Sequence, residues 1–230
     1  MKDPELSIVI PAFNAAPFLA PLLEKLRAFP SCWEIIVVDD GSTDDTPRLR
    51  KRCPERILWL HRARGGPSAA RNTGLRQASA PYLAFLDADD EWPASHPAET
   101  LSAVRAGGWD IVLGRTLLLA PGGDGSFLPT GEPFHTLLMG AGVYRRDLFE
   151  RIGGFNEELF FGEDADWFLR AREQGARMAL CEATTLHYRR HGGNASRSSG
   201  SATGGLLRAL HLSMQRRRNP TAALAALPRL

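Results

Sequence analysis

Three near-adjacent carboxylates follow an apolar segment in the run Phe85-Leu86-Asp87-Ala88-Asp89-Asp90. Clustered carboxylates repel one another, so such a run is costly unless a cation compensates the charge. Two aspartates one residue apart at a strand end can present oxygens to a hard divalent ion, and that ion can in turn hold a diphosphate. The run therefore favours a metal-diphosphate site. A solvated acidic turn is the alternative, because aspartate is common in turns.

Apolar, β-branched runs and helical spacing alternate through the first half of the chain. The predicted strands are residues 6–10, 34–38, 57–60 and 82–86, and the predicted helices are residues 17–29, 42–52 and 69–78, the last capped by Ser68. This alternation indicates an α/β fold in which helices cover both faces of a mostly parallel sheet. Ligands of such sheets gather at the carboxyl ends of the strands. We therefore expect residues 11–14, 39–40 and 87–90 to meet at one edge.

The second half of the chain is less regular. Its predicted helices are residues 97–106, 146–152 and 163–174, and its predicted strands are residues 110–119 and 140–144. Residues 121–133 are rich in Gly and Pro and indicate a mobile loop. Residues 192–205, mostly Gly, Ser, Asn and Ala, indicate a flexible segment.

Composition narrows the class of protein. With 230 residues, of which 43% are hydrophobic and 23% charged, the chain fits one large soluble domain that needs no disulfide staple. A formal net charge of +2 argues against a nucleic-acid binder, which concentrates a larger basic excess. The three cysteines form no Cys-x-x-Cys pair and favour neither a disulfide framework nor a zinc site.

Two features of the sequence bear on the cellular location of the protein. The first residues show no signal-peptide pattern, and the most apolar later stretch, residues 111–120, is interrupted by Arg115 and is too short to span a bilayer. We expect a cytoplasmic protein. Residues 206–230 read as a basic helical tail in which Arg216, Arg217 and Arg218 form a solvated face. Docking on anionic lipid, peripheral at the inner membrane face, is the alternative.

Six motifs occur in an order that resembles family 2 glycosyltransferases of the GT-A fold. They are SIVIPAFN (7–14), VVDDGSTD (37–44), GPSAARNTG (66–74), DADD (87–90), GGF (153–155) and GEDADW (162–167). The match covers residues 6–191. It implies a Rossmann-like domain over residues 1–205, with a nucleotide-binding half at 1–95 and an acceptor-binding half at 96–205. It also implies inverting transfer of a sugar from a nucleotide diphosphate to an acceptor hydroxyl, in cell-surface polysaccharide or glycoconjugate synthesis.

The resemblance assigns a nucleotide site to the first half. Asp40 would accept the imide N–H of uracil, a donor that cytosine lacks, and capping the next helix is its alternative role. The fork of Arg71 can turn toward a base or a phosphate, although a surface ion pair would also explain it. Asp87 would touch the ribose or a metal-bound water. The predicted nucleotide-binding residues are Pro11, Ala12, Phe13, Asp40, Arg71, Asp87 and Ala88.

A divalent cation is the predicted cofactor. Asp89 would bind the ion directly, and Mn²⁺ or Mg²⁺ suits hard oxygen ligands of this kind. His191 would add a metal or phosphate contact, or is an ordinary exposed histidine. The glycines beside it would let this distal segment close over the diphosphate as a lid.

Inversion requires backside attack by a deprotonating hydroxyl, so a base must face the sugar opposite the diphosphate. The resemblance places Asp164 there, at the start of a helix. A carboxylate that caps this helix is the competing explanation. Glu163 would hold the acceptor or orient the base. Trp167 is a further acceptor-binding or base-orienting residue, with a core position as its alternative.

Several alternatives stay open. A nucleotidyltransferase would carry a Gly-rich basic loop after the first strand, which this chain lacks, and a glycoside hydrolase would need no nucleotide pocket. A catalytically inactive nucleotide-sugar-binding paralogue remains an alternative although Asp89 and Asp164 are present. The absence of a Gln-x-x-Arg-Trp motif favours single addition over processive synthesis. A UDP-sugar is favoured over dTDP or GDP donors, and the acceptor is a saccharide, a lipid-linked molecule or another hydroxyl compound.

Overall fold

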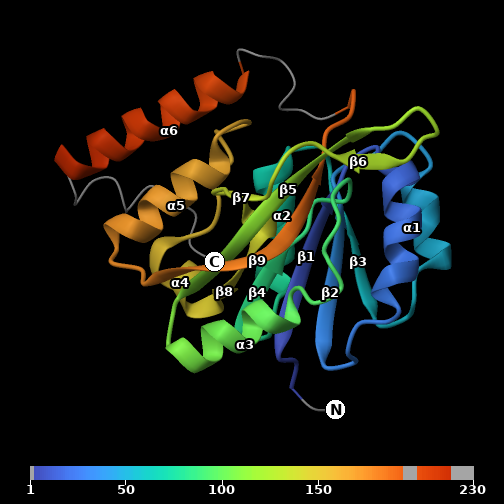
Figure 1. The fold of residues 1–230 in the computed structure, drawn as a ribbon, viewed down its shortest axis with the longest axis horizontal. Helices are drawn as coiled ribbons and strands as arrows, with labels where there is room; N and C mark the ends of the chain where they lie inside the picture. Colours follow the sequence, from blue (N-terminus) through green and yellow to red (C-terminus); the bar gives the residue numbers. More distant parts are fainter. Residues whose placement is uncertain (1–2, 194–200, 219–230) are drawn as a thin grey trace.

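The computed structural model describes residues 3–193 and 201–218, which fold around one central sheet (Figure 1). In this part of the chain the sheet has nine strands, and its main path runs β3-β2-β1-β4-β8-β5-β6. The strands are β1 (Leu6–Ala12), β2 (Trp33–Asp39), β3 (Ile57–His61), β4 (Tyr82–Phe85), β5 (Ile111–Pro121), β6 (Phe127–Pro129), β7 (Phe134–His135), β8 (Gly142–Arg145) and β9 (Met178–Arg189). The first four strands are parallel, β8 runs antiparallel to β4 and β5, and β9 runs parallel to β5.

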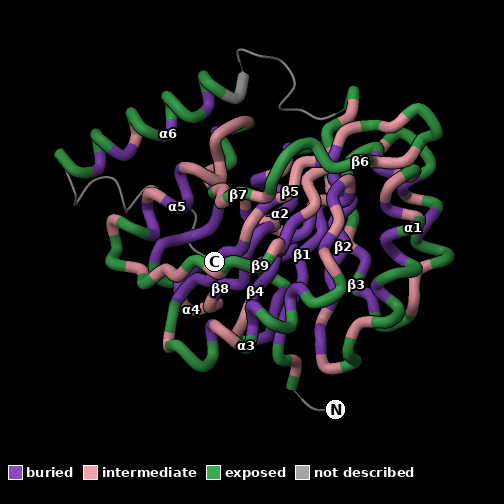
Figure 2. Tube along the Cα trace, viewed as in Figure 1, coloured by how far each residue is buried: buried purple, intermediate pink, exposed green. Residues whose placement is uncertain are grey.

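Helices cover both faces of this sheet. They are α1 (Ala16–Leu26), α2 (Pro67–Gln77), α3 (Ala98–Gly107), α4 (Arg146–Ile152), α5 (Glu163–Glu173) and α6 (Ser201–Arg218), with 3₁₀ helices η1 (Thr46–Arg52) and η2 (Met139–Ala141). Residues Leu6, Ile8 and Ile10 of β1 join a core with α1 and α3, whereas Val9 faces a second core with α2, α4 and α5. The fully buried strands in the centre of Figure 2 reflect these two cores. This alternation fixes the register of β1, because a slip of one residue would exchange the two faces.

The register of β1 brings the predicted polar segments to one edge of the sheet. Ala12 at the end of β1 lies beside Asp39 at the end of β2, and Val9 lies beside Phe85 at the end of β4. The residues that follow each strand therefore emerge at the same carboxyl edge. The predicted α/β architecture with a mostly parallel sheet is confirmed.

Two predicted helix starts are wrong. The segment after β2 is not helical from residue 42. It forms a turn in which Asp39 accepts a hydrogen bond from the Ser42 N–H, and only the 3₁₀ helix η1 follows. Helix α2 begins at Pro67 rather than after a Ser68 cap, and its N-cap is Gly66 with φ of 91°. Glycine fits this left-handed position, and proline is well suited to the first helical turn.

The later part of the chain also departs from the prediction. The predicted loop at residues 121–133 contains β6, which pairs with β5. The twelve-residue strand β9 was not predicted at all, and it carries His187. Helix α6 begins at Ser201, inside the segment expected to be flexible, of which residues 194–200 lie outside the described residues. In the described part of the chain, none of the helices has the length and apolar character needed to cross a bilayer.

Helix α6 packs along α5 at the edge of the molecule (Figure 1). Its buried face comprises Gly205, Ala209, Ser213 and Arg216. The prediction of a solvated face is therefore wrong for Arg216, whose side chain lies against two carboxylates of α5. The last residues of the predicted tail, 219–230, lie outside the described residues.

Candidate functional site

A cavity of about 560 Å³ opens at the carboxyl ends of β1, β2 and β4. Its walls come from the segment after β1, the Asp87 to Asp89 segment after β4, the start of α2 and the start of α5. All of the predicted site residues except Trp167 line it: Pro11, Ala12, Phe13, Asp40, Arg71, Asp87, Ala88, Asp89, Glu163, Asp164 and His191. The structure thus brings together residues that lie up to 180 positions apart in the chain.

Arg71 on α2 is the central charge of this cavity. Its guanidinium donates to both oxygens of Asp87, at 2.8 and 3.0 Å, and to Glu163 at 2.9 Å and Asp164 at 3.1 Å. Burial alone would lower the pKa of Arg71, but the three carboxylates outweigh burial and raise it well above its usual value. Arg71 is therefore a fixed cation that joins the two acidic segments.

Asp164, the second residue of α5, has a mostly buried side chain, 15% exposed, that accepts two hydrogen bonds. One oxygen accepts from Arg71, and the other accepts from the Met139 N–H at 2.9 Å. Burial is the largest cause that raises the pKa of Asp164 to about 7, with Arg71 opposing the rise and Glu163 adding to it. A carboxyl group with this pKa can exchange a proton near neutral pH.

Asp89 contacts His191 in the wall of the cavity. Its Oδ2 lies 3.0 Å from the His191 Nε2, and burial together with the charge of Asp87 raises its pKa against the effect of His191. Asp90 turns away, and its Oδ1 accepts from the Arg189 N–H at 2.9 Å. Among the described residues no three His, Cys, Asp or Glu side chains form a metal cluster. Asp89 and His191 nevertheless fit a cation that draws its other ligands from a diphosphate, because carboxylate oxygens and imidazole nitrogens both bind divalent cations.

The other end of the cavity is formed by Asp40 and aromatic residues. Asp40 is buried and accepts hydrogen bonds from the Gly65 and Gly66 N–H groups at 3.0 and 2.7 Å, and from the side chains of Arg62 and Arg64. The Arg64 guanidinium lies 3.1 Å from the centre of the Phe13 ring. Sequence reasoning missed both arginines. Their place directly after β3, at the carboxyl edge of the sheet, was the available signal.

Trp167 does not line the cavity. Its side chain is fully buried against Phe149 and Tyr144, and its indole N–H donates to the Gly153 carbonyl at 3.3 Å. The predicted acceptor contact is wrong for this residue and its alternative, a position in the core, is confirmed, because the side chain has no exposed surface. It helps to hold α5 from the core side.

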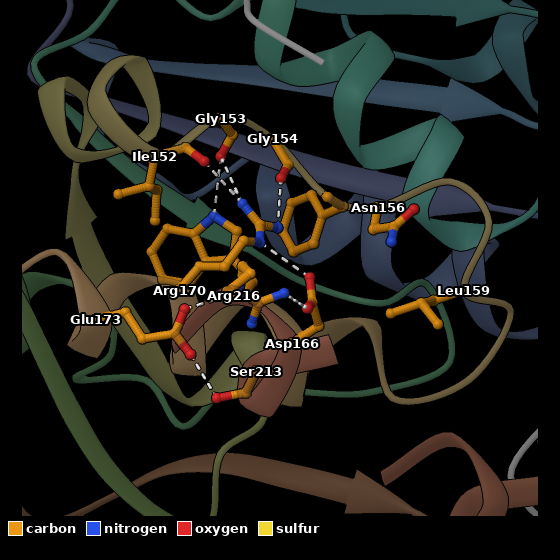
Figure 3. A network of polar contacts seen from close by, with 12 residues as sticks. Ile152, Gly153, Gly154, Asn156, Leu159, Asp166, Arg170, Glu173, Ser213 and Arg216 are labelled. Atoms are coloured by element: carbon orange, nitrogen blue, oxygen red, sulfur yellow. Dashed lines mark hydrogen bonds and ion pairs between the residues drawn. The ribbon is translucent and has the colours of Figure 1, made fainter. Parts of the chain in front are cut away.

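The backbone groups of the GGF turn form hydrogen bonds with side chains from two helices. Asn72, next to Arg71 on α2, donates to the Phe155 carbonyl and accepts from the Phe155 N–H, both at 2.8 Å. On the other side, Arg170 of α5 donates to the Ile152 and Gly154 carbonyls at 2.9 and 2.6 Å (Figure 3). The turn therefore connects α2 and α5, the helices that carry Arg71 and Asp164. Sequence reasoning missed Arg170.

Comparison with solved structures identifies the fold. The structure of Staphylococcus aureus TarS 1–349 in complex with UDP-GlcNAc matches 94% of this chain and 67% of its own, with a TM-score of 0.74 and 22% identity. The mannosyltransferase PcManGT of Pyrobaculum calidifontis, solved with GDP-Man and Mn²⁺, matches 94% and 62% with a TM-score of 0.64 and 21% identity. The fold is that of GT-A glycosyltransferases, as predicted.

The family follows from the sequence comparison. The model of glycosyl transferase family 2 matches residues 7–153, and the chain belongs to this family. The uncharacterized glycosyltransferase EpsJ of Bacillus subtilis is 30% identical over 210 residues, 81% of this chain and 61% of EpsJ. The succinoglycan biosynthesis protein ExoU of Rhizobium meliloti is 28% identical, over 76% of this chain and 59% of ExoU. The chain thus spans about three fifths of the length of EpsJ and ExoU, and 14% of a Rickettsia bellii relative.

Proposed function

We propose that this protein is a metal-dependent, inverting glycosyltransferase that moves a single sugar from a UDP-sugar to an acceptor hydroxyl. One observation carries the proposal. A single cavity contains the Asp87–Asp89 segment at one wall and Asp164, with its pKa raised to about 7, at another. The Asp87–Asp89 segment suits the binding of an activated diphosphate, and Asp164 suits the proton transfer that an attacking hydroxyl needs.

The donor would lie along the carboxyl edge of the sheet. Backbone groups of Pro11 to Phe13 and the carboxylate of Asp40 would hold the base, and Arg71 and Asp87 would lie near the ribose and phosphates. TarS, solved with UDP-GlcNAc, supports a uridine donor, whereas PcManGT was solved with GDP-Man. Guanine also offers ring N–H donors to a carboxylate, so both donors belong in the test.

Asp89 and His191 would hold a Mn²⁺ or Mg²⁺ ion, which neutralises charge on the departing diphosphate when bound. PcManGT, solved with Mn²⁺, supports a divalent cation here. The short separation between the Asp89 carboxylate and the His191 ring suits two ligands of one ion.

Asp164 would act as the general base. Its carboxylate takes the proton of the acceptor hydroxyl while that oxygen forms a bond to the anomeric carbon, and the bond from this carbon to the diphosphate breaks on the opposite side. The configuration of the sugar is inverted. Arg71 and the Met139 N–H orient the two oxygens of Asp164, and Arg71 also couples the base to Asp87 on the donor side.

A donor panel tests the proposal. UDP-, dTDP-, GDP- and CDP-sugars are incubated with the protein and Mn²⁺, and release of the nucleotide diphosphate is measured with and without EDTA. We expect cation-dependent hydrolysis of a UDP-sugar and none of CDP-sugars. As a control, Asp45→Asn changes an exposed aspartate outside the cavity, and this variant should release the nucleotide diphosphate as fast as the wild type does. Binding of UDP without any turnover would instead support an inactive nucleotide-sugar-binding protein.

A further inference from the structure

Helix α6 meets α5 at the end that carries Asp164. Gly162, directly before α5, and Gly205 of α6 approach so closely that a Cβ on Gly162 would lie 2.4 Å from the Gly205 carbonyl carbon. A Cβ on Gly205 would in turn lie 2.5 Å from the Phe161 carbonyl carbon. The next residue, Leu206, lines the cavity together with Asp164. The start of α6 therefore forms part of the wall of the cavity that contains the predicted base.

A buried ion network holds α6 in this place (Figure 3). Arg216 donates to Asp166 at 2.8 Å and to Glu173 at 2.7 Å, and Ser213 also donates to Glu173. Asp166 is fully buried and accepts a second charged bond from Arg170 at 2.9 Å. Breaking a buried pair of this kind is strongly destabilising, because the remaining carboxylate loses its compensating charge.

We propose that Arg216 is a positioning residue for Asp164: by holding α6 against α5, it keeps Gly205 against the turn before α5 and Leu206 in the cavity wall, which limits the access of water to the base. This inference rests on the proposed function, since it assigns α6 a part in the same site. It concerns the acceptor side, where Glu163, Leu206 and Leu138 line the cavity around Asp164.

The shielding has a consequence for the base. The titratable groups that act on Asp164 are Arg71 from α2, Glu163 beside it, Asp87 after β4 and Tyr144 of β8. Of the described charges on α6, Arg216 pairs with Asp166 and Glu173, whereas Arg208, Arg217 and Arg218 are exposed, and His211 contacts Gln215. Among the described residues of α6, Leu206 is the one that lines the cavity with Asp164, so α6 acts on the base by covering part of this cavity. Water that entered after α6 loosened would lower the pKa of Asp164 toward its ordinary value.

Arg216→Met tests the proposal. Arg217→Met is the matched control on the same helix, because Arg217 is exposed and its Nε lies 3.8 Å from the Glu173 Oε1, farther than the Arg216 Nε. Hydrogen exchange of the backbone amides of residues 160–166 gives a readout that needs no activity. We expect faster exchange in Arg216→Met and wild-type exchange in Arg217→Met. Arg216→Lys should restore part of the protection, because lysine can pair with one of the two carboxylates.

A second pair of variants leaves the ion network untouched. Gly205→Ala forces a methyl group against Phe161, whereas a Cβ on Gly204 meets nothing within 4 Å. Both changes raise helix propensity to the same degree. Gly205→Ala should reproduce the exchange pattern of Arg216→Met, and Gly204→Ala should not. This pair decides the question if Arg216→Met fails to fold.

Kinetics separate positioning from general stability. In Arg216→Met and Gly205→Ala we expect kcat for transfer to fall roughly 10-fold with UDP affinity within about 2-fold of wild type. The acidic limb of the kcat/KM profile should move down by about one pH unit. Equal exchange in Arg216→Met and Arg217→Met, or an unmoved acidic limb, would overturn the inference. If the wild type transfers no sugar, the proposed function fails, while the exchange experiment still tests the contact between α6 and α5.

Discussion

The donor end and the base end of the cavity are built in different ways. At the donor end, Asp40 and the Asp87 to Asp89 segment directly follow buried parallel strands, so the register of the sheet places them. At the base end, Asp164 depends on side chains from several distant segments, namely Arg71, Arg170 and Arg216, and on the GGF turn between them. We infer that the donor end tolerates loss of a single contact better than the base end.

The largest expected effect is at the base end. Asp164→Asn keeps the shape of the side chain but removes the group that accepts the proton, so kcat for transfer should fall by about 10²- to 10⁴-fold. Binding of UDP, measured by calorimetry, should stay within about 2-fold of wild type. Glu163→Gln is the matched neighbour and should lose much less. An Asp164→Asn variant that transfers sugar at the wild-type rate would exclude the general-base role.

Asp89→Ala should weaken donor binding. Removing this carboxylate takes away the predicted cation ligand, and UDP affinity in the presence of Mn²⁺ should fall by roughly 10- to 100-fold. Affinity measured in EDTA should change little, which separates a lost cation from a damaged pocket. If both affinities fall equally, Asp89 acts through the fold and not through a cation.

The pH dependence of sugar transfer should report the ionisation of Asp164. Because the pKa of Asp164 is raised to about 7 in the unliganded protein, kcat/KM for transfer should rise with pH as this carboxyl group ionises, with a midpoint near 7.

Stability should move in the opposite direction. Between about pH 4 and pH 7 the folded protein holds a proton on Asp164 that the unfolded chain has lost, so the free energy of unfolding should fall as pH rises through this window. Asp164→Asn should lack this part of the slope in denaturant titrations. A steeper slope in the variant than in wild type would contradict the raised pKa.

The smallest of these effects concerns the link between the two ends. Asn72→Ala leaves the buried N–H and carbonyl groups of Phe155 without their partner, and we expect it to reduce the free energy of unfolding by about 2 to 4 kcal/mol. Asn156→Ala, which removes only a local turn contact to Glu158, should cost less than about 1 kcal/mol. Urea denaturation measures both. Equal losses would show that Asn72 is not a link between α2 and the GGF turn.

The same contrast explains how far the sequence could predict the molecule. Strands such as 6–10 and 34–38 carry a strong apolar signal, and the polar residues after them need only the topology of a parallel sheet to be placed together. The positions of Asp40, Asp87 and Asp89 at one edge could therefore be predicted. The family motifs added Asp164, which no local pattern distinguishes from a helix cap.

The remaining features depend on distant partners. Arg216 looks like any arginine in a basic helix, and its buried position follows only from Asp166, fifty residues earlier. Strand β9 mixes polar and apolar residues without clear alternation, because half-exposed pairing along β5 determines it. The start of α2 depends on a left-handed Gly66 rather than on the serine two residues later. Such features are set by tertiary packing.

The most direct test is a crystal structure of the protein with UDP and Mn²⁺. We predict that the cation lies against Asp89, that the base of UDP lies at the Asp40 end, and that the space beyond the terminal phosphate faces Asp164. A structure with UDP and Mn²⁺ bound away from Asp89, or with Asp164 on the far side of a wall from the diphosphate, would contradict it.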